Sequence, residues 1–332
     1  MSSTESPDTR AASLPVPPAG PGPRAGAGET VRSVTLPGLT LAVRTPGTPS
    51  APDGAAPDRA PALYVHGLGG SSQNWSALMP LLADRVAGEA LDLPGFGAAP
   101  PPDDGNYSVS AQARAVIRHL DAAGRGPVHL LGNSMGGAAA TRVAAVRPDL
   151  VRTLTLISPA LPELPPQLTA VPTALLAVPG AMRLFGRLTR DWTPERRARE
   201  VLALCYGDPR RVTPEGLGAA VDEYAQRLEL PYAWEAFGRS ARGLVNAYTL
   251  GGQHGLWRQA ERVLAPTLLV YGGRDRLVSY RMARRAAAAF RGSRLLTLPE
   301  AGHVAMMEYP EAVARAFREL LDDDESADAD GS

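Results

Sequence analysis

Ser134 lies in residues 132–136, whose sequence Gly-Asn-Ser-Met-Gly fits the pattern G-x-S-x-G. In this pattern a serine occupies a sharp turn between a strand and a helix, where neighbouring Cβ atoms have little room. An apolar run precedes it at 127–131, and an alanine-rich segment follows at 135–146. Because both flanks match that context, the sequence predicts that Ser134 is a nucleophile rather than part of a chemically silent glycine turn.

A serine hydroxyl is a weak nucleophile at neutral pH, so it needs a base to accept its proton. His303 follows the predicted strand 294–298, and a loop in that position can reach across the carboxyl edge of a parallel sheet. We therefore expect His303 to be the base. The remaining histidines are predicted in a glycine loop, on a helix, inside a strand and after a helical region: His66, His119, His129 and His254.

The base in turn needs a carboxylate to orient it, which in the chain order Ser…Asp/Glu…His lies between the other two residues. Asp275 comes just after the predicted strand 267–271 and is the expected acid. The structural alternative for Asp275 is a turn aspartate, a helix cap or a surface ion pair with the flanking arginines. Glu300 is closer to His303 in sequence, but it would have to fold back on its own loop.

The alkoxide that forms during nucleophilic attack needs preorganised hydrogen-bond donors. The backbone N–H of Met135 follows the nucleophile, and the N–H of Leu68 lies in the loop 66–70, directly after a predicted strand. We expect these two groups to form an oxyanion hole, with a flexible glycine loop as the alternative for 66–70.

The composition argues against several classes of partner. Of the 332 residues, 34 are basic and 34 acidic, so no net positive field attracts nucleic acid or an anionic membrane. The single cysteine, Cys205, excludes an intrachain disulfide, and no apolar run is long enough to span a bilayer. The N-terminus has no apolar signal segment, so we expect a cytoplasmic protein. No cofactor or metal is expected, and the oligomeric state stays open.

Segments with strand and helix patterns alternate through most of the chain. The predicted strands are 31–35, 39–43, 62–66, 88–93, 127–131, 151–157, 267–271 and 294–298. The predicted helices are 72–82, 108–123, 135–146, 279–290 and 310–321. This alternation predicts an α/β fold with a mostly parallel, twisted sheet and helices on both faces.

The alternation stops over residues 161–250, where helical stretches and prolines replace it. We therefore predict a core of 31–160 and 251–321, interrupted by a helical lid at 161–250 that folds over the carboxyl ends of the strands. The tail 1–30 is rich in Pro, Gly, Ser and Ala, and the tail 322–332 is acidic. Both tails are expected to be disordered.

Within the lid, residues 171–188 are rich in large apolar side chains, interrupted by Arg183 and Arg187. We expect this segment to pack its apolar face on the pocket, with a helix lying on a membrane surface as the alternative. Aromatic residues in and beside the lid are expected to line an apolar pocket, to pack lid against core, or both: Trp192, Tyr206, Tyr224, Tyr232, Trp234, Phe237 and Tyr248.

Five segments, in this order, resemble the α/β-hydrolase superfamily over residues 31–321. They are 66–70 (HGLGG), 92–97 (DLPGFG), 132–137 (GNSMGG), 273–275 (GRD) and 302–303 (GH). The resemblance implies the α/β-hydrolase fold, with Ser134, Asp275 and His303 as a catalytic triad. It gives Asp92 a structural role only.

The resemblance also ranks the possible substrates. A serine at position 134 differs from the aspartate of haloalkane dehalogenases and epoxide hydrolases. The string at 132–137 is similar to that of meta-cleavage-product hydrolases, but residues 68–71 and Val304 differ from the oxyanion loop and the tryptophan usual in those enzymes. A hydrolase of small to medium apolar carboxylic esters, acting through an acyl-enzyme, is therefore expected first. A C–C bond hydrolase comes second, and a non-catalytic ligand-binding protein of the same fold third.

Overall fold

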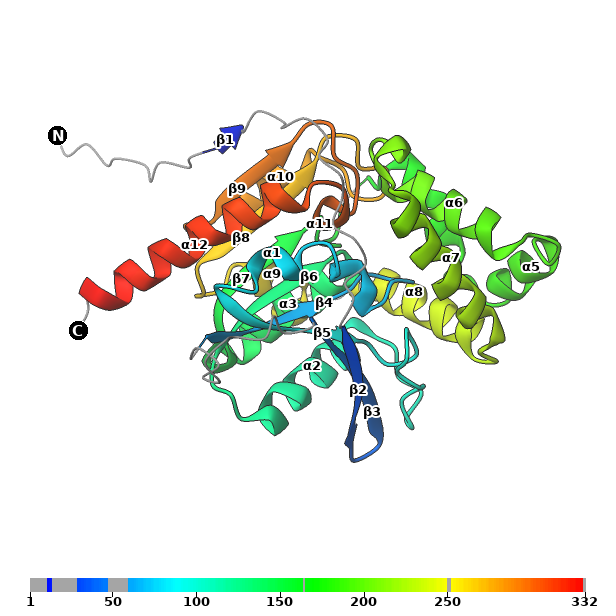
Figure 1. Ribbon diagram of the computed structural model, residues 1–332, viewed down its shortest axis with the longest axis horizontal. Coiled ribbons are helices and arrows are strands. Elements are labelled where there is room, and N and C mark those ends of the chain that lie inside the picture. The colour runs from blue at the N-terminus through cyan, green and yellow to red at the C-terminus, as the bar shows by residue number, and fades with distance from the viewer. Residues whose placement is uncertain (1–10, 14–28, 47–58, 164, 250–251, 331–332) are drawn as a thin grey trace.

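A computed structural model describes residues 11–13, 29–46, 59–163, 165–249 and 252–330. Within these residues, nine strands form one sheet in the order β1-β9-β8-β7-β6-β4-β5-β3-β2 (Figure 1). Their bounds are β1 Ala11–Ser13, β2 Thr30–Leu36, β3 Leu39–Thr45, β4 Ala60–Val65, β5 Val86–Asp92, β6 Val128–Asn133, β7 Val151–Ile157, β8 Thr267–Gly272 and β9 Arg294–Leu298.

The sheet is parallel except at one edge, where β3 pairs antiparallel with both β2 and β5. Strands β2 and β3 form a hairpin around Pro37 and Gly38, and Gly38 has the positive φ of 67° that its tight turn requires. The predicted strands are confirmed, with ends that differ by at most two residues. All the parallel strands therefore end at one edge of the sheet, and the loops after them meet there.

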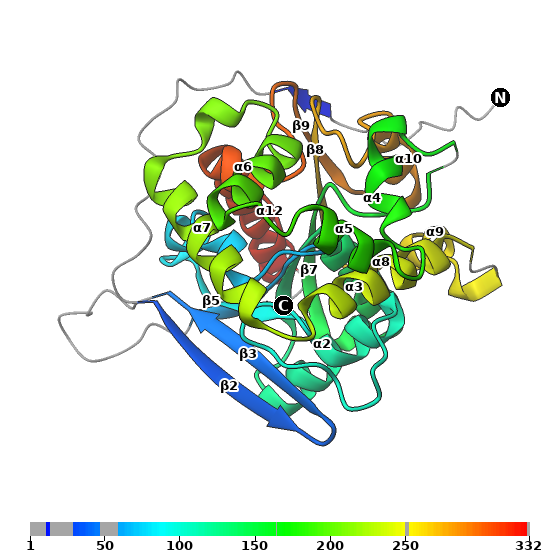
Figure 2. The same ribbon diagram turned by 90° about the vertical axis from the view of Figure 1, so that its right-hand side faces the viewer.

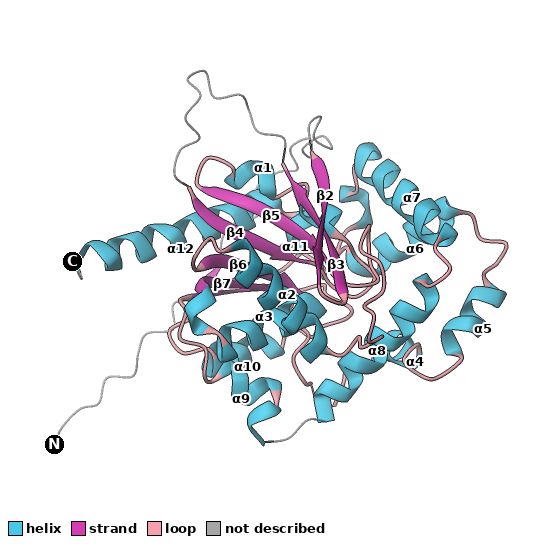
Figure 3. Ribbon diagram, turned by 90° about the horizontal axis from the view of Figure 1, so that it is seen from below, coloured by secondary structure: helices cyan, strands magenta, loops and turns pink. Residues whose placement is uncertain are grey.

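The strands bury both of their faces, as a central parallel sheet must. Along β4 and β6, Leu63 and Leu130 contribute to the core on one face, while Tyr64 and Leu131 contribute to the core on the other. Helices cover both faces (Figure 3). On the first face they are α2 Val109–Ala123, α3 Met135–Val146, α9 Leu256–Ala260 and α10 Met282–Ala289; on the second, α1 Met79–Leu82, α11 Ala305–Glu308 and α12 Pro310–Asp330.

Between β7 and α9 the described chain contains helices and no strand, and these helices stand beside the sheet (Figure 1). The α-helices are α4 Val171–Leu175, α5 Ala181–Leu188, α6 Pro194–Cys205, α7 Pro214–Glu229 and α8 Ala233–Thr249. Two prolines of this insertion begin helices, because a first-turn proline loses no hydrogen bond. Thr193 and Thr213 stand before them as N-caps and accept a backbone N–H with their side chains.

The acidic C-terminus is not disordered over the residues that the structure describes, so that prediction was wrong. Helix α12 continues to Asp330 instead of ending near Leu321. Arginines of the core face the acidic run. Arg85 Nη2 lies 2.7 Å from Asp322 Oδ1, and Arg294 forms an ion pair with Asp323. The sequence pattern suggested a solvated charge run, because the arginines that oppose it are far away along the chain.

The N-terminal tail also departs from the prediction at one point. Residues 11–13 form β1, which pairs parallel with β9 at the edge of the sheet. An edge strand presents unpaired backbone N–H and C=O groups, so even a short segment of suitable geometry can pair with it. The rest of the predicted tail, up to residue 28, lies outside the described residues.

His129 is buried inside β6, with Nδ1 2.9 Å from Thr153 Oγ1 and its ring edge-on to Phe317. Burial lowers the pKa of His129 to about 4, and Arg152 adds to this lowering. The imidazole of His129 therefore becomes protonated near pH 6.5 in the unfolded chain but only near pH 4 in the folded chain.

As the pH falls from 6.5 to 4, the free energy of unfolding of the wild type should fall by about 3 kcal/mol more than that of His129→Met. Urea titrations at pH 7, 5.5 and 4 measure this difference. The matched control is His254→Met, at an exposed position, which should follow the wild type. The same acid sensitivity in all three proteins would contradict the role of His129.

Candidate active site

Ser134 occupies a strained turn between β6 and α3. Its φ of 54° and ψ of −117° lie in a region that non-glycine residues rarely adopt. The turn is held by the end of β7 and the residues after it: the N–H of Ser134 donates to Ile157 O (3.1 Å), and its carbonyl accepts from Ala160 N (2.9 Å). Such strain costs about 1–3 kcal/mol and persists where surrounding contacts over-determine the geometry. The strand–turn–helix context predicted around Ser134 is therefore confirmed.

Gly136, the last glycine of the 132–136 motif, lies too close to the neighbouring strand to carry a side chain. A Cβ on Gly136 would collide with the backbone carbonyls of Val65 and His66 at the end of β4. Gly132 is similar, because its Cβ would lie 2.7 Å from Gly136 O. The two glycines therefore allow α3 to begin directly against the neighbouring strand, which aims its N-terminus at the turn.

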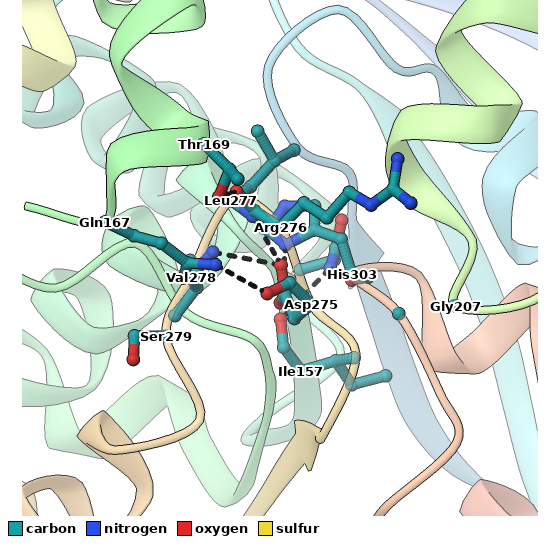
Figure 4. A network of polar contacts seen from close by, with 12 residues as sticks. Ile157, Gln167, Thr169, Gly207, Asp275, Arg276, Leu277, Val278, Ser279 and His303 are labelled. Atoms are coloured by element: carbon teal, nitrogen blue, oxygen red, sulfur yellow. Dashed lines mark hydrogen bonds and ion pairs between the residues drawn. The ribbon is translucent and has the colours of Figure 1, made fainter.

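His303 and Asp275, the predicted base and acid, lie in contact (Figure 4). His303 Nδ1 is 2.9 Å from Asp275 Oδ2, and both side chains are buried. The second carboxylate oxygen accepts the N–H groups of Leu277 (2.8 Å) and Val278 (2.9 Å). Burial alone would raise the pKa of Asp275, but His303 and these two N–H donors outweigh it and hold the pKa below its usual value. The carboxylate is therefore charged at neutral pH and can orient the imidazole.

Asn133, which sequence reasoning did not single out, links the turn of Ser134 to the loop of His303. Its Nδ2 donates to Ile157 O and to His303 O, both at 3.0 Å. The backbone N–H of His303 also donates to Cys205 O (2.7 Å) at the end of α6. Within the described residues no hydrogen bond joins Ser134 Oγ to the His303 ring, and in unliganded sites this bond is often long until substrate binds.

Replacing Asn133 with alanine should lower the free energy of unfolding by about 1–3 kcal/mol, because the carbonyls of Ile157 and His303 lose a buried donor. The value of kcat should also fall, since the loop of His303 loses its tie to the nucleophile. Urea denaturation and ester turnover measure the two effects. Asn246→Ala, at an exposed position of α8, is the matched control. An equal loss of stability and kcat in both variants would contradict the role of Asn133.

The loop 66–70, where Leu68 was predicted as an oxyanion donor, follows β4 directly. His66 is buried beneath it, with Nδ1 2.7 Å from Gly67 O and with Nε2 accepting the N–H of Leu93 (3.0 Å). Burial lowers the pKa of His66, so the ring is neutral, with its proton on Nδ1. The N–H of Leu68 donates to no group of the described chain, and that of Met135, at the first position of α3, has no acceptor within its helix.

Helix α8 of the insertion contacts this same loop. Gly69 has a φ of 73°, and a Cβ there would lie 2.7 Å from the ring of Phe237. A Cβ built on Gly67 would lie 3.0 Å from Ser134 Cβ, so the loop borders the nucleophile on its other side. The insertion and the turn of Ser134 therefore enclose the loop between them.

Two further polar side chains fix the loops around the site. The buried carboxylate of Glu308 accepts the N–H groups of Gly302 (2.7 Å), Asp208 (2.9 Å) and Gly207 (3.1 Å), which joins the loop before His303 to the insertion. Gln167 Nε2 donates to Asp275 O (2.9 Å), as Figure 4 shows. Neither contact follows a sequence motif, because each partner comes from a distant part of the chain.

The alternative candidates lie elsewhere. Glu300 forms an ion pair with Arg274 at the surface and does not contact His303. Asp92 is buried and accepts the N–H groups of Ser72 (2.5 Å) and Ala98 (2.9 Å), so it holds two loops together. Among the described residues, no group of three or more His, Cys, Asp or Glu side chains could hold a metal ion.

A cleft of about 720 Å³ lies between the insertion and the core. Gly69 and Gly70 form part of its wall, so it reaches the predicted oxyanion loop, although neither Ser134 nor His303 lines it. Helices α6 and α7 contribute aliphatic and aromatic side chains: Ala198, Val201, Leu202, Ala219, Ala220 and Tyr224. Glu223 and Arg227, which are paired at 2.5 Å, add charge to the same wall.

Comparisons with known proteins agree with this geometry. A model of the family described as "Alpha/beta hydrolase family" matches residues 62–316. The pimeloyl-(acyl-carrier protein) methyl ester esterase of Neisseria meningitidis serogroup A is 29% identical over 277 residues, covering 80% of this chain and 78% of the relative. A 2-hydroxy-6-oxo-6-(2'-aminophenyl)hexa-2,4-dienoic acid hydrolase of Metapseudomonas resinovorans is 27% identical over 270 residues, covering 79% and 83%.

A solved structure shows the same fold. The meta-cleavage product hydrolase of Pseudomonas fluorescens IP01 superimposes with a TM-score of 0.69 at 18% identity, covering 88% of this chain and 97% of that one. No helix of the described residues is long and apolar enough to cross a membrane.

Proposed function

The chain belongs to the alpha/beta hydrolase family, and on that basis we propose that it is a serine hydrolase of carboxylic esters. Ser134 is the nucleophile, His303 the general base and acid, and Asp275 the carboxylate that orients His303. The observation that carries this proposal is the buried 2.9 Å contact of His303 Nδ1 with Asp275, on a loop tied through Asn133 to the strained turn of Ser134.

In the proposed reaction, Ser134 Oγ attacks the ester carbonyl carbon while His303 Nε2 accepts the hydroxyl proton. The N–H groups of Leu68 and Met135 stabilise the negative oxygen of the tetrahedral intermediate. His303 then donates its proton to the leaving alkoxide, and an acyl-enzyme remains. Water, activated by the same histidine, releases the acid and restores Ser134.

We further propose that the insertion acts as a lid and that its cleft with the core holds the acyl group. The apolar side chains of α6 and α7 suit a small to medium apolar acyl chain, and the cleft reaches the loop of Leu68. A relative that is named for methyl ester hydrolysis supports an ester as the substrate class.

C–C hydrolysis of a ring-cleavage diketone is the second candidate, and the relative from M. resinovorans favours it. Such a substrate carries a carboxylate. To bind it, the protein needs a cationic side chain that faces the pocket and is not already paired with an acidic residue. Arg183, Arg187 and Arg190 of the insertion are exposed, and two arginines of the cleft, Arg227 and Arg210, are paired with Glu223 and Asp208. Arg211 and Arg315 also line the cleft and form no ion pair within the described residues. Arg211 and Arg315 therefore keep the C–C reaction as the second candidate, and the apolar side chains of α6 and α7 favour the ester.

The decisive experiment compares kcat/KM for p-nitrophenyl acetate, butyrate and octanoate with that for a ring-fission diketone. We expect the butyrate ester to be among the best substrates, no turnover by Ser134→Ala and no effect of EDTA. A diketone value about 100-fold above the best ester, equal to about 2.7 kcal/mol of transition-state stabilisation, would reverse the ranking. Absence of turnover on every substrate would favour a ligand-binding protein.

A further inference from the structure

The outer end of the insertion exposes an unusual share of the large apolar side chains. Thirteen such residues are exposed in the described chain, and six of them lie between 168 and 188. Single exposed apolar residues are ordinary on a protein surface, but a concentration of them indicates a contact site. We call these six residues the outer face of α4–α5: Leu168, Val171, Leu175, Val178, Leu184 and Leu188.

Helix α5 already packs against the rest of the protein through its other side. Met182 is buried, and its Cγ lies 3.1 Å from the Cβ position of Gly238 on α8. The ring of Phe185 meets that of Trp234 edge-on, with centroids 6.1 Å apart. Leu184 and Leu188 lie on the opposite side and are 57% and 73% exposed, so packing on α8 does not use them.

Helix α4 and the turn after it repeat this arrangement. Val171 and Leu175 lie one turn apart on α4, Val178 lies in the turn after it, and all three are exposed. Ala177 is buried, and its carbonyl accepts Arg242 Nε of α8 (3.0 Å). The expectation that 171–188 packs its apolar face on the pocket is therefore wrong for these side chains, which are exposed. Figure 2 shows helix α5 on the side of the molecule that faces the viewer.

The charge on this face has one sign. Residues 164–190 contain three arginines and no acidic residue. Arg183 and Arg187 are exposed beside Leu184 and Leu188 and form no ion pair within the described part of the chain. Arg190 is weakly paired with Asp191 at 3.5 Å. Apolar side chains that alternate with arginines on one surface are typical of helices that lie in the headgroup region of a membrane.

We propose that the outer face of α4–α5 is a docking surface for an anionic lipid membrane. Leucine and valine side chains enter the acyl boundary, while Arg183 and Arg187 bind the lipid phosphates. A second copy of the chain suits the face less well, because a two-fold contact would bring the same unpaired arginines together without a carboxylate between them.

Docking there would bring the lipid surface close to the candidate active site. Thr169 and Gln167, at the start of the same segment, bind the backbone carbonyls of Arg276 and Asp275. The membrane would therefore lie at the end of the insertion that joins the loop of the proposed catalytic acid. Binding itself needs no hydrolysis, so this inference is tested separately from the proposed function.

The test is co-sedimentation with phosphatidylcholine vesicles that contain either no phosphatidylglycerol or 30 mol% of it. The wild type should bind the anionic vesicles and release as NaCl rises. Leu184→Asp/Leu188→Asp should lower the partition coefficient about tenfold or more, because two apolar insertions are lost. Arg183→Gln and Arg187→Gln should each lower it about fivefold on anionic vesicles and little on neutral ones.

Leu264→Asp is the matched control, since Leu264 is 80% exposed on the core, outside this face, and should bind as the wild type does. Unchanged thermal unfolding and p-nitrophenyl acetate turnover establish that the variants are folded. Failure of the wild type to bind anionic vesicles overturns the proposal. A dimer in sedimentation velocity that Leu184→Asp/Leu188→Asp dissociates also overturns it, because the face is then an interface between two copies.

Discussion

Replacing Ser134 with alanine is expected to lower kcat for ester hydrolysis by about 10⁵–10⁶-fold, because the reaction loses the only atom that can form the acyl-enzyme. Binding of the ester should change little, since the two proposed oxyanion N–H groups belong to the backbone. The folded state should stay as stable or gain slightly: alanine keeps the Cβ, and the turn is held by the backbone bonds of Ser134 to Ile157 and Ala160.

Steady-state kinetics with p-nitrophenyl butyrate, together with thermal unfolding, measure both effects. A fluorophosphonate probe should label the wild type stoichiometrically and leave Ser134→Ala unlabelled. Ser33→Ala, at an exposed position of β2, is the matched control and should retain full activity and labelling. Turnover of Ser134→Ala within tenfold of the wild type would remove Ser134 from the mechanism.

Asp275→Asn has the second largest expected effect, a loss of about 10⁴-fold in kcat. The amide can still accept the N–H groups of Leu277 and Val278, so the loop should keep its shape. Its NH₂ group then faces His303 Nδ1 and selects the tautomer with the proton on Nε2, and the neutral side chain no longer stabilises the imidazolium. The pKa of Asp275 lies below its usual value, so the wild-type carboxylate stays charged throughout the pH range of the assay.

Glu300→Gln is the matched control for Asp275→Asn, because Glu300 is the rival carboxylate nearest His303 in sequence. It pairs with Arg274 at the surface, and its replacement should leave kcat within about twofold. A large loss in Glu300→Gln with a small loss in Asp275→Asn would exchange the two assignments. Comparable large losses without unfolding would mean that the loop geometry, rather than one carboxylate, controls the reaction.

The sequence alone predicted the features that local sterics control. The glycines at 132 and 136 and their apolar flanks predict the strained turn, because a Cβ at 136 would collide with the end of β4 and a Cβ at 132 with the start of α3. The alternation of strand and helix patterns likewise predicts the parallel sheet and therefore one edge at which the loops of Ser134, Asp275 and His303 meet.

Tertiary structure decided the features that depend on residues far apart along the chain. The bond from Asn133 to His303 joins residues 170 positions apart, and no local pattern marks it. The acidic C-terminus continues helix α12, and arginines that are far away along the chain face it. Residues 171–188 offer apolar side chains on two sides, and only the position of α8 determines which side is buried. Periodicity reports that a helix has an apolar face, but the partner that covers the face is set by the assembled fold.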